Sequence, residues 1–272
     1  MNIIFNKIEE NYKRKKPFVA YRKPNSNTIS GFLMNNDELC YTSDFTESGF
    51  VFAPFKSEEK TVVFPIDKSE YLEEELLLDK GFLLKNEFTN HNDSEKLNHI
   101  HLVEKTLEEI NKNELQKVVV SRKEKVQLND FDILITFKKL LKTYTNAFVY
   151  VWYHPKVGLW FGATPETLLN ISKNRFKTMS LAGTQVYKND EEVIWGSKEL
   201  EEQQLVTNFI ESQLESISTG LSIDKTETVK AGNLLHLRTK VEGELNKNSS
   251  LKELLKQPFV GYRKPTNLDE LD

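Results

Sequence analysis

The chain is poor in the features that indicate disulfide bonds, membrane insertion or secretion. Among its 272 residues Cys40 is the single cysteine, so no internal disulfide can form and a reducing compartment, the cytoplasm, is expected. No apolar run approaches the roughly 18 residues that a membrane-spanning helix needs. The charged first residues lack an apolar core followed by a small-residue cleavage site, so no secretory signal is predicted.

Charge and histidine content disfavour two further classes. The chain has 37 Lys and Arg against 41 Asp and Glu, mixed throughout, and no basic stripe indicates a nucleic-acid partner. The five histidines form no metal-ligand pattern, because His99 and His101 would point in different directions on a helix. A hydrophobic content of 38% is ordinary for a globular protein, and the length suffices for one large α/β domain or two small ones.

The first part of the chain is predicted to be rich in β-strands. Short apolar runs recur there between Asn, Asp, Ser and Gly turns, which is typical of strands and hairpins. These runs occupy residues 17–22, 29–34, 49–55 and 61–66. We therefore expect residues 1–94 to form a β-rich part of the same domain as residues 95–256.

The second part is predicted to alternate helices and strands. Apolar residues at helical spacing, with a capping Ser94, predict a helix over residues 94–113. Further helices are expected at residues 131–144, 190–216 and 252–256. The β-branched run at 118–120 predicts a central strand. Other strands are expected at residues 146–154, 159–163, 168–172, 175–181, 226–231 and 234–245.

One short segment occurs twice. Residues 17–24, PFVAYRKP, recur as residues 258–265, PFVGYRKP, with one difference in eight positions. An isolated pair of this length is far too short to indicate a repeat protein. The acidic end of the chain is expected to fray.

Residues 160–204 contain the pattern that most suggests chemistry. Glu166 follows a proline in a run of small and apolar residues, and Gly183 with Thr184 closes a small-residue turn further on. A carboxylate at a turn, followed by a strand and an exposed Gly-Thr backbone, favours a site for a small anionic ligand. The alternative is a plain β-hairpin with a proline turn and a glycine turn.

Five motifs in order resemble the chorismate-utilising enzymes, which include isochorismate, salicylate, aminodeoxychorismate and anthranilate synthases. They are Lys117 in KVVVSR, Glu166 in ATPETL, Gly183 and Thr184 in LAGT, Glu202 in KELEEQQLV and His236 in LHLRT. The resemblance covers roughly residues 95–255. It implies an α/β (α+β) fold in which two packed, mainly antiparallel sheets are flanked by helices.

Two positions within these motifs indicate a subclass. Anthranilate synthases carry glutamine where this chain has Lys117, and the amine-adding enzymes carry a Pro-Ile pair ahead of the Gly-Thr turn, where this chain has Ser180 and Leu181. The resemblance therefore favours the water-adding branch, isochorismate synthase. Salicylate synthase, which also eliminates pyruvate, and a non-catalytic member of the family remain alternatives.

The resemblance also implies roles for individual residues. Lys117 would be the base that activates water, and Glu166 the acid that protonates the departing hydroxyl of chorismate. A lysine acts as a base at neutral pH only where desolvation or positive charge favours its neutral form, and burial keeps a glutamic acid protonated. Gly183, Thr184 and His236 would contact the substrate.

The family uses Mg²⁺, for which the resemblance implies Glu202 as a ligand and Glu199 as a second acidic position one turn earlier. Magnesium takes few protein carboxylates and completes its shell with water and substrate oxygens. The alternative is that this acidic run is a solvated helix face.

The resemblance stops near residue 256, where the family continues with further strands, a substrate-binding arginine and a second metal-binding glutamate. Here residues 257–264 largely repeat the N-terminal motif, and 257–272 form an atypical tail. We therefore expect a core at 95–256 that lacks its C-terminal strands, and weak or no turnover. The family is expected to be monomeric, with self-association through an exposed strand edge as the alternative. Menaquinone and siderophore synthesis are not distinguished.

Overall fold

The computed structural model of the protein describes residues 3–55, 59–78, 93–112, 116–128, 130–188 and 193–246. They fall into two compact units, one within Met1–Leu78 and Ile133–Asp272 and the other within Asp79–Asp132. In these ranges no helix has the length and apolar character needed to cross a membrane. The predicted helix at 252–256, the second copy of the repeat and the tail lie outside the described residues.

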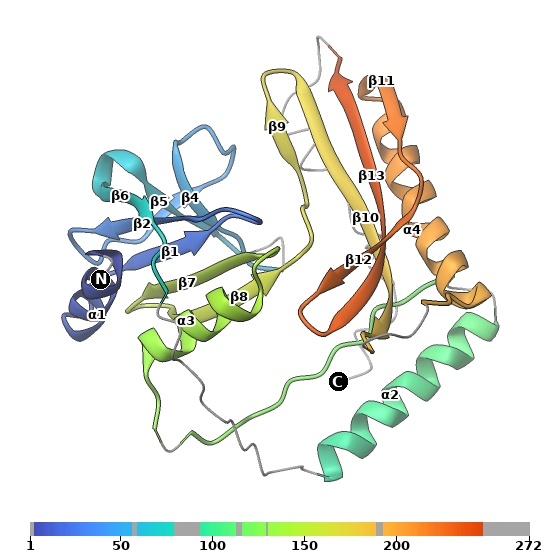
Figure 1. The fold of residues 1–272 in the computed structure, drawn as a ribbon, viewed down its shortest axis with the longest axis horizontal. Coiled ribbons are helices and arrows are strands. Elements are labelled where there is room, and N and C mark those ends of the chain that lie inside the picture. Colours follow the sequence, from blue (N-terminus) through green and yellow to red (C-terminus); the bar gives the residue numbers. More distant parts are fainter. Residues whose placement is uncertain are drawn as a thin grey trace. The chain divides into compact units, whose positions relative to one another are not determined.

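Groups of consecutive antiparallel strands are separated by helices along the described chain (Figure 1). The helices are α1 (Ile3–Lys13), η1 (Ile66–Lys68, a 3-10 helix), α2 (Asp93–Asn111), α3 (Ile133–Thr143) and α4 (Ser197–Glu215). The first strands are β1 (Phe18–Arg22), β2 (Thr28–Met34), β3 (Cys40–Thr42), β4 (Gly49–Phe52), β5 (Thr61–Pro65) and β6 (Ser69–Glu75). The later strands are β7 (Phe148–His154), β8 (Gly158–Thr164), β9 (Asn170–Ser172), β10 (Arg175–Val186), β11 (Ser218–Ile223), β12 (Glu227–Ala231) and β13 (Leu234–Leu245).

The first sheet has the order β6-β2-β1-β7-β8, and both of its faces are covered. Alternate side chains of β1 enter different cores: Phe18 and Ala20 pack with α1 and α3, whereas Val19 packs with β5 and Trp152. A strand that is buried on both faces needs an unbroken apolar run. This explains why Phe-Val-Ala follows the proline in the first copy of the repeat.

Helix α1 was not predicted from the sequence. Ile4, Phe5 and Ile8 form its buried stripe, at the spacing of one helical face. The carboxylate of Glu74 in β6 accepts hydrogen bonds from the backbone N–H groups of Ile3 (3.0 Å) and Ile4 (2.7 Å). A distant side chain therefore caps this helix, and the local sequence around residue 3 does not reveal that cap.

A small third sheet, β3-β5-β4, covers the face of the first sheet opposite α1 and α3. Aromatic rings fill the interface, with Trp152 stacked on Phe52 at 4.5 Å and on Phe64 at 5.4 Å between ring centroids. The resemblance led us to expect two sheets, so this third one is an addition. The expected α/β fold with mainly antiparallel sheets flanked by helices is confirmed.

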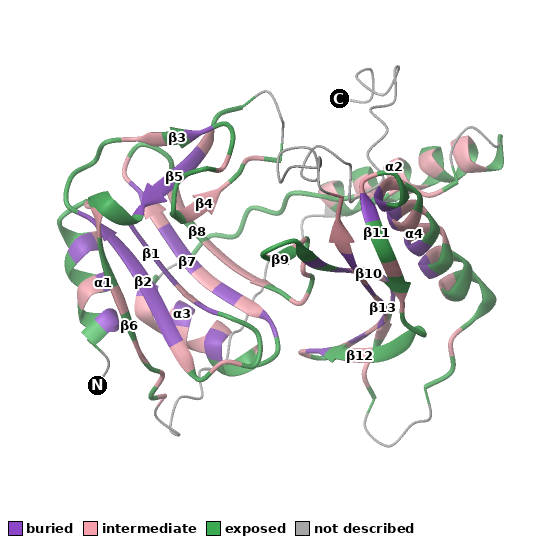
Figure 2. Ribbon diagram, turned by 90° about the horizontal axis from the view of Figure 1, so that it is seen from above, coloured by how far each residue is buried: buried purple, intermediate pink, exposed green. Residues whose placement is uncertain are grey.

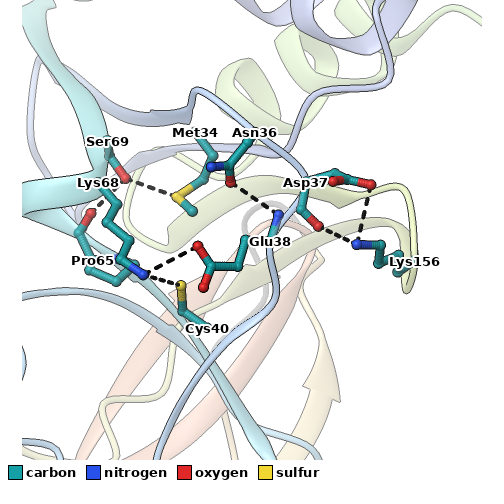
Figure 3. A network of polar contacts seen from close by, with 9 residues as sticks. All are labelled: Met34, Asn36, Asp37, Glu38, Cys40, Pro65, Lys68, Ser69 and Lys156. Carbon is teal, nitrogen blue, oxygen red and sulfur yellow. Dashed lines mark hydrogen bonds and ion pairs between the residues drawn. The ribbon is translucent and has the colours of Figure 1, made fainter.

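Polar contacts fix the loop that follows β2 (Figure 3). Lys68 lies 3.3 Å from the Glu38 carboxylate and 3.6 Å from the Cys40 sulfur. Lys156 donates to the backbone carbonyl of Asp37 at 2.7 Å and lies 3.2 Å from its carboxylate. These contacts tie the loop to η1 on one side and to the β7–β8 turn on the other.

The second sheet has the order β11-β13-β10-β9, with β12 also paired to β13. Helix α4 packs on this sheet through a core of Phe176, Ile210, Leu214 and Val241 (Figure 2). The residues of α4 that face the sheet recur at helical spacing, as amphipathic packing requires.

Two local predictions were wrong. Residues 118–120 form no strand, and the side chain of Val119 is 75% exposed. A β-branched run becomes a strand only when another strand pairs with it, and the described residues of the 79–132 unit include none. Gly183 and Thr184 lie inside β10 rather than in a turn between strands.

Candidate functional site

Gly183 forms a bulge in the ladder between β10 and β13. The register passes from Ala182 opposite Leu237 to Thr184 opposite His236, which leaves Gly183 as the extra residue. Its φ of +65° lies in the left-handed region, where glycine carries no Cβ penalty. The small-residue motif therefore specifies a bulge within a long strand.

The bulge brings together the three residues that were predicted to contact substrate. The Nδ1 atom of His236 lies 3.1 Å from the carbonyl oxygen of Gly183 and 3.2 Å from the hydroxyl of Thr184. A carbonyl only accepts, so Nδ1 must carry the proton when it bonds to Gly183. In the neutral ring Nε2 is then the acceptor. Their role in substrate binding stays a prediction.

The start of α4 lies against this bulge. A Cβ placed on Gly183 would be 3.4 Å from Cβ of Glu199 and 3.5 Å from the ring of Trp195. Trp195 donates its indole N–H to the hydroxyl of Thr228 in β12 at 2.9 Å, and Gln185 of β10 donates to the carbonyl of Ile194 at 2.8 Å. The segment before α4 is thus tied to two strands of the sheet.

Glu199 and Glu202 are half-buried and lie three residues apart on α4. This spacing places both carboxylates on one side of the helix. Glu199 also has a structural role at the start of α4. Its Oε2 lies beside the N-cap residue Gly196, where an added Cβ would be 2.7 Å from it. A negative charge at this position stabilises the start of a helix.

Two hard oxygen donors on one helix face fit Mg²⁺, which takes few protein carboxylates and leaves positions for water and substrate. Within the described ranges no group of three or more His, Cys, Asp or Glu side chains is placed to hold a metal. The assignment of Glu199 and Glu202 as ligands stays a prediction.

The two residues predicted to be catalytic lie in different parts of the fold. Glu166 follows the end of β8, its side chain is exposed, and its backbone N–H donates to the hydroxyl of Thr164 at 3.3 Å. Lys117 is half-buried in the compact unit within Asp79–Asp132. Their approach to a common substrate stays a prediction.

Sequence reasoning missed Trp195 as a neighbour of the bulge. The signal available for it was weak, consisting of one large aromatic residue followed by Gly196 at the start of an acidic helix. Aromatic side chains of this kind are more often part of a core. Only the contact with Gly183 places Trp195 beside the candidate site.

The fold and these motifs define a chorismate-binding enzyme. Residues 58–257 match the sequence profile of the family described as chorismate binding enzyme. The chain belongs to this family, which confirms the resemblance. No curated protein matches the chain by sequence.

Two solved structures share the fold. DhbC from Bacillus anthracis, assigned as a 2,3-dihydroxybenzoate-specific isochorismate synthase, aligns with a TM-score of 0.67 and 18% identity over 94% of this chain and 75% of its own. MenF from Escherichia coli, a menaquinone-specific isochorismate synthase, aligns with a TM-score of 0.60 and 13% identity over 89% of this chain and 68% of its own. At these identities the likeness shows the fold.

Proposed function

We propose that this protein acts on chorismate as an isochorismate synthase, with Mg²⁺ as cofactor. The observation that carries the proposal is a lysine at position 117, within KVVVSR, in a chain of the chorismate-binding family. The amine-adding anthranilate synthases have glutamine at this position. Of the two solved structures described above, MenF is an isochorismate synthase and DhbC is assigned as one, which supports the same choice.

The chemistry is an exchange of hydroxyl groups on a cyclic diacid. Lys117 takes a proton from a water molecule, whose oxygen bonds to C2 of the ring. The ring double bonds shift, and the C4 hydroxyl leaves with a proton from Glu166. One water enters and one leaves, so the product is an isomer of the substrate. Glu166 is exposed in the structure, and a bound substrate would shield its side chain from water.

The remaining site residues bind and orient the substrate. The hydroxyl of Thr184 and the His236 ring lie beside the bulge and provide polar groups for the ring substituents. When bound, Mg²⁺ supplies positive charge for a substrate carboxylate. Glu199 and Glu202 of α4 would hold it, and α4 begins beside that bulge.

Product analysis tests the proposal. Chorismate and Mg²⁺ are incubated with a high concentration of the protein, so that slow turnover is detectable, and the products are separated by chromatography. We expect isochorismate without pyruvate. Salicylate with pyruvate would instead identify a salicylate synthase, and the absence of any product would indicate a member of the family that does not catalyse the reaction.

Substitutions test the two assigned catalytic roles. Lys117→Ala and Glu166→Gln should each lower the rate by at least about 100-fold, because each removes one proton-transfer group. Lys123→Ala, at a nearby exposed lysine, is the matched control and should keep the wild-type rate. Circular dichroism checks that all three variants are folded. A wild-type rate in either catalytic variant would refute its assigned role.

A further inference from the structure

Gln203 is a buried polar residue on the inner face of α4, with 2% of its surface exposed. Its amide nitrogen lies 3.2 Å from the carbonyl oxygen and 2.8 Å from the hydroxyl of Ser180 in β10. It also lies 3.0 Å from the hydroxyl of Thr239 in β13. Ser180 and Thr239 are directly opposite each other in the β10–β13 ladder. The amide of Gln203 therefore bridges one cross-strand pair.

The orientation of this amide follows from its partners. The carbonyl of Ser180 can only accept a hydrogen bond, so the nitrogen of Gln203, and not its oxygen, must face β10. The Ser180 hydroxyl continues to the hydroxyl of Thr207, one turn further along α4, at 2.7 Å. The Thr239 hydroxyl continues to that of Thr226 at 2.8 Å. The result is a polar network, buried at Gln203, Ser180, Thr207 and Thr239, that joins the helix to both strands.

The energy of the hydrogen bonds in this network depends on direction, whereas the energy of the apolar contacts of α4 does not. Hydrophobic packing through Ile210 and Leu214 holds the helix to the sheet but is non-directional. The hydrogen bonds from Gln203 to Ser180 and Thr239 favour one arrangement, because a shift of the helix would break them. The amide of Gln203 consequently fixes the register of α4 along β10 and β13.

This register controls the candidate site. Gln203 directly follows Glu202 and lies one turn after Glu199 on α4. Of the pair that it bridges, Ser180 lies three residues before Gly183 on β10, and Thr239 lies three residues after His236 on β13. The same hydrogen bonds thus set both carboxylates relative to the bulge.

We infer that Gln203 is a positioning residue, which holds the Glu199 and Glu202 carboxylates in place for a divalent cation. The inference rests on the proposed function, since it assigns Gln203 to the magnesium site of that reaction. The loss of a direct hydrogen-bond partner of a metal ligand weakens metal binding by about 10–100-fold, and a residue that acts through the helix should lie at the low end of that range.

The test measures metal binding rather than turnover. Mn²⁺, an EPR-visible substitute for Mg²⁺, is titrated into wild type, Gln203→Met and Gln204→Met. Methionine preserves the volume of glutamine but has no amide. Gln204 is the matched control, because its amide is exposed and donates to Asn208 on the same helix, at 2.6 Å. We expect an affinity about tenfold weaker in Q203M and unchanged in Q204M.

The outcomes separate this inference from the proposed function. Wild-type Mn²⁺ affinity in a folded Q203M protein would overturn the inference and leave Gln203 with a purely structural role. No Mn²⁺ binding by the wild-type protein, or unchanged binding by Glu202→Ala, would overturn the proposed metal site and this inference with it. Thr239→Val provides a second variant should Q203M not fold. We expect weaker Mn²⁺ binding there too, and wild-type affinity would overturn the inference.

Discussion

Gly183 has a left-handed φ of +65°, and a Cβ at this position would make contacts no shorter than 3.4 Å. Gly183→Ala should therefore lower the free energy of unfolding by about 1–2 kcal/mol, the cost of this conformation for an L-residue. Gly220, with φ of +62° and no atom within 4 Å of an added Cβ, is the matched control. Urea denaturation should give Gly220→Ala a similar loss.

The two glycine variants should differ in ligand binding, because of the two only Gly183 bonds to the His236 ring and would place an added Cβ 3.4 Å from Glu199. Gly183→Ala should weaken Mn²⁺ and chorismate binding, whereas Gly220→Ala should leave both unchanged. Equal effects of the two substitutions would show that the bulge has no special connection with the site.

His154 is fully buried, and its environment predicts how stability depends on pH. Burial lowers the pKa of His154; the backbone of Glu38 opposes this, the Lys156 ammonium lowers the pKa further, and the Asp37 carboxylate raises it. Since the unfolded chain takes up this proton first, stability should fall as the pH drops below about 6.5 toward the lower pKa of the folded protein.

His154→Phe removes this titration and places another ring among the aromatic neighbours of β7. In this variant the free energy of unfolding should fall less between neutral and mildly acidic pH than it does in the wild type. Urea denaturation at several pH values measures it. Identical pH dependence in both proteins would mean that His154 does not contribute.

Helix α3 depends on a residue from a distant strand. Arg22 of β1 is 3% exposed and donates to the carbonyls of Leu141 at 2.9 Å, Ala147 at 3.2 Å and Tyr144, at and beyond the end of the helix. A cation at this end satisfies carbonyls that have no partner within the helix. Burial lowers the pKa of Arg22, but a guanidinium stays charged at neutral pH.

Arg22→Met should lower the free energy of unfolding by about 2–4 kcal/mol, because it leaves buried carbonyls unpaired. Arg175→Met is the control, since its ion pair with Glu244 is exposed and contributes about 0–1 kcal/mol. Urea denaturation of both variants gives the comparison. Equal losses would contradict a capping role for Arg22.

Elements with a strong local pattern could be predicted from the sequence. The strands β7 and β13 and the helix α4 follow from their apolar periodicity. The unpredicted strands β3, β6 and β11 are short or rich in polar residues, and each exists because a neighbouring strand pairs with it. Residues 118–120 show the reverse case, in which a strong local preference for a strand meets no pairing strand in the described unit.

At the scale of the whole molecule, motifs in the sequence identified residues that lie together in the candidate site, but not the contacts that hold them there. Gly183, Thr184 and His236 were found from motifs and lie together in the structure. Gln203 and Trp195 were not found, because their importance depends on contacts with strands far away in the sequence. The local sequence also does not distinguish the buried Gln203 from the exposed Gln204 beside it.

The central claim is that this protein adds water to C2 of chorismate. The most direct measurement is mass spectrometry of isochorismate formed by the protein with Mg²⁺ in water enriched in oxygen-18. We expect the product to carry one solvent oxygen, located at C2, and no labelled product to form with Lys117→Ala. Isochorismate without solvent oxygen, or labelled product in equal yield from that variant, would contradict it.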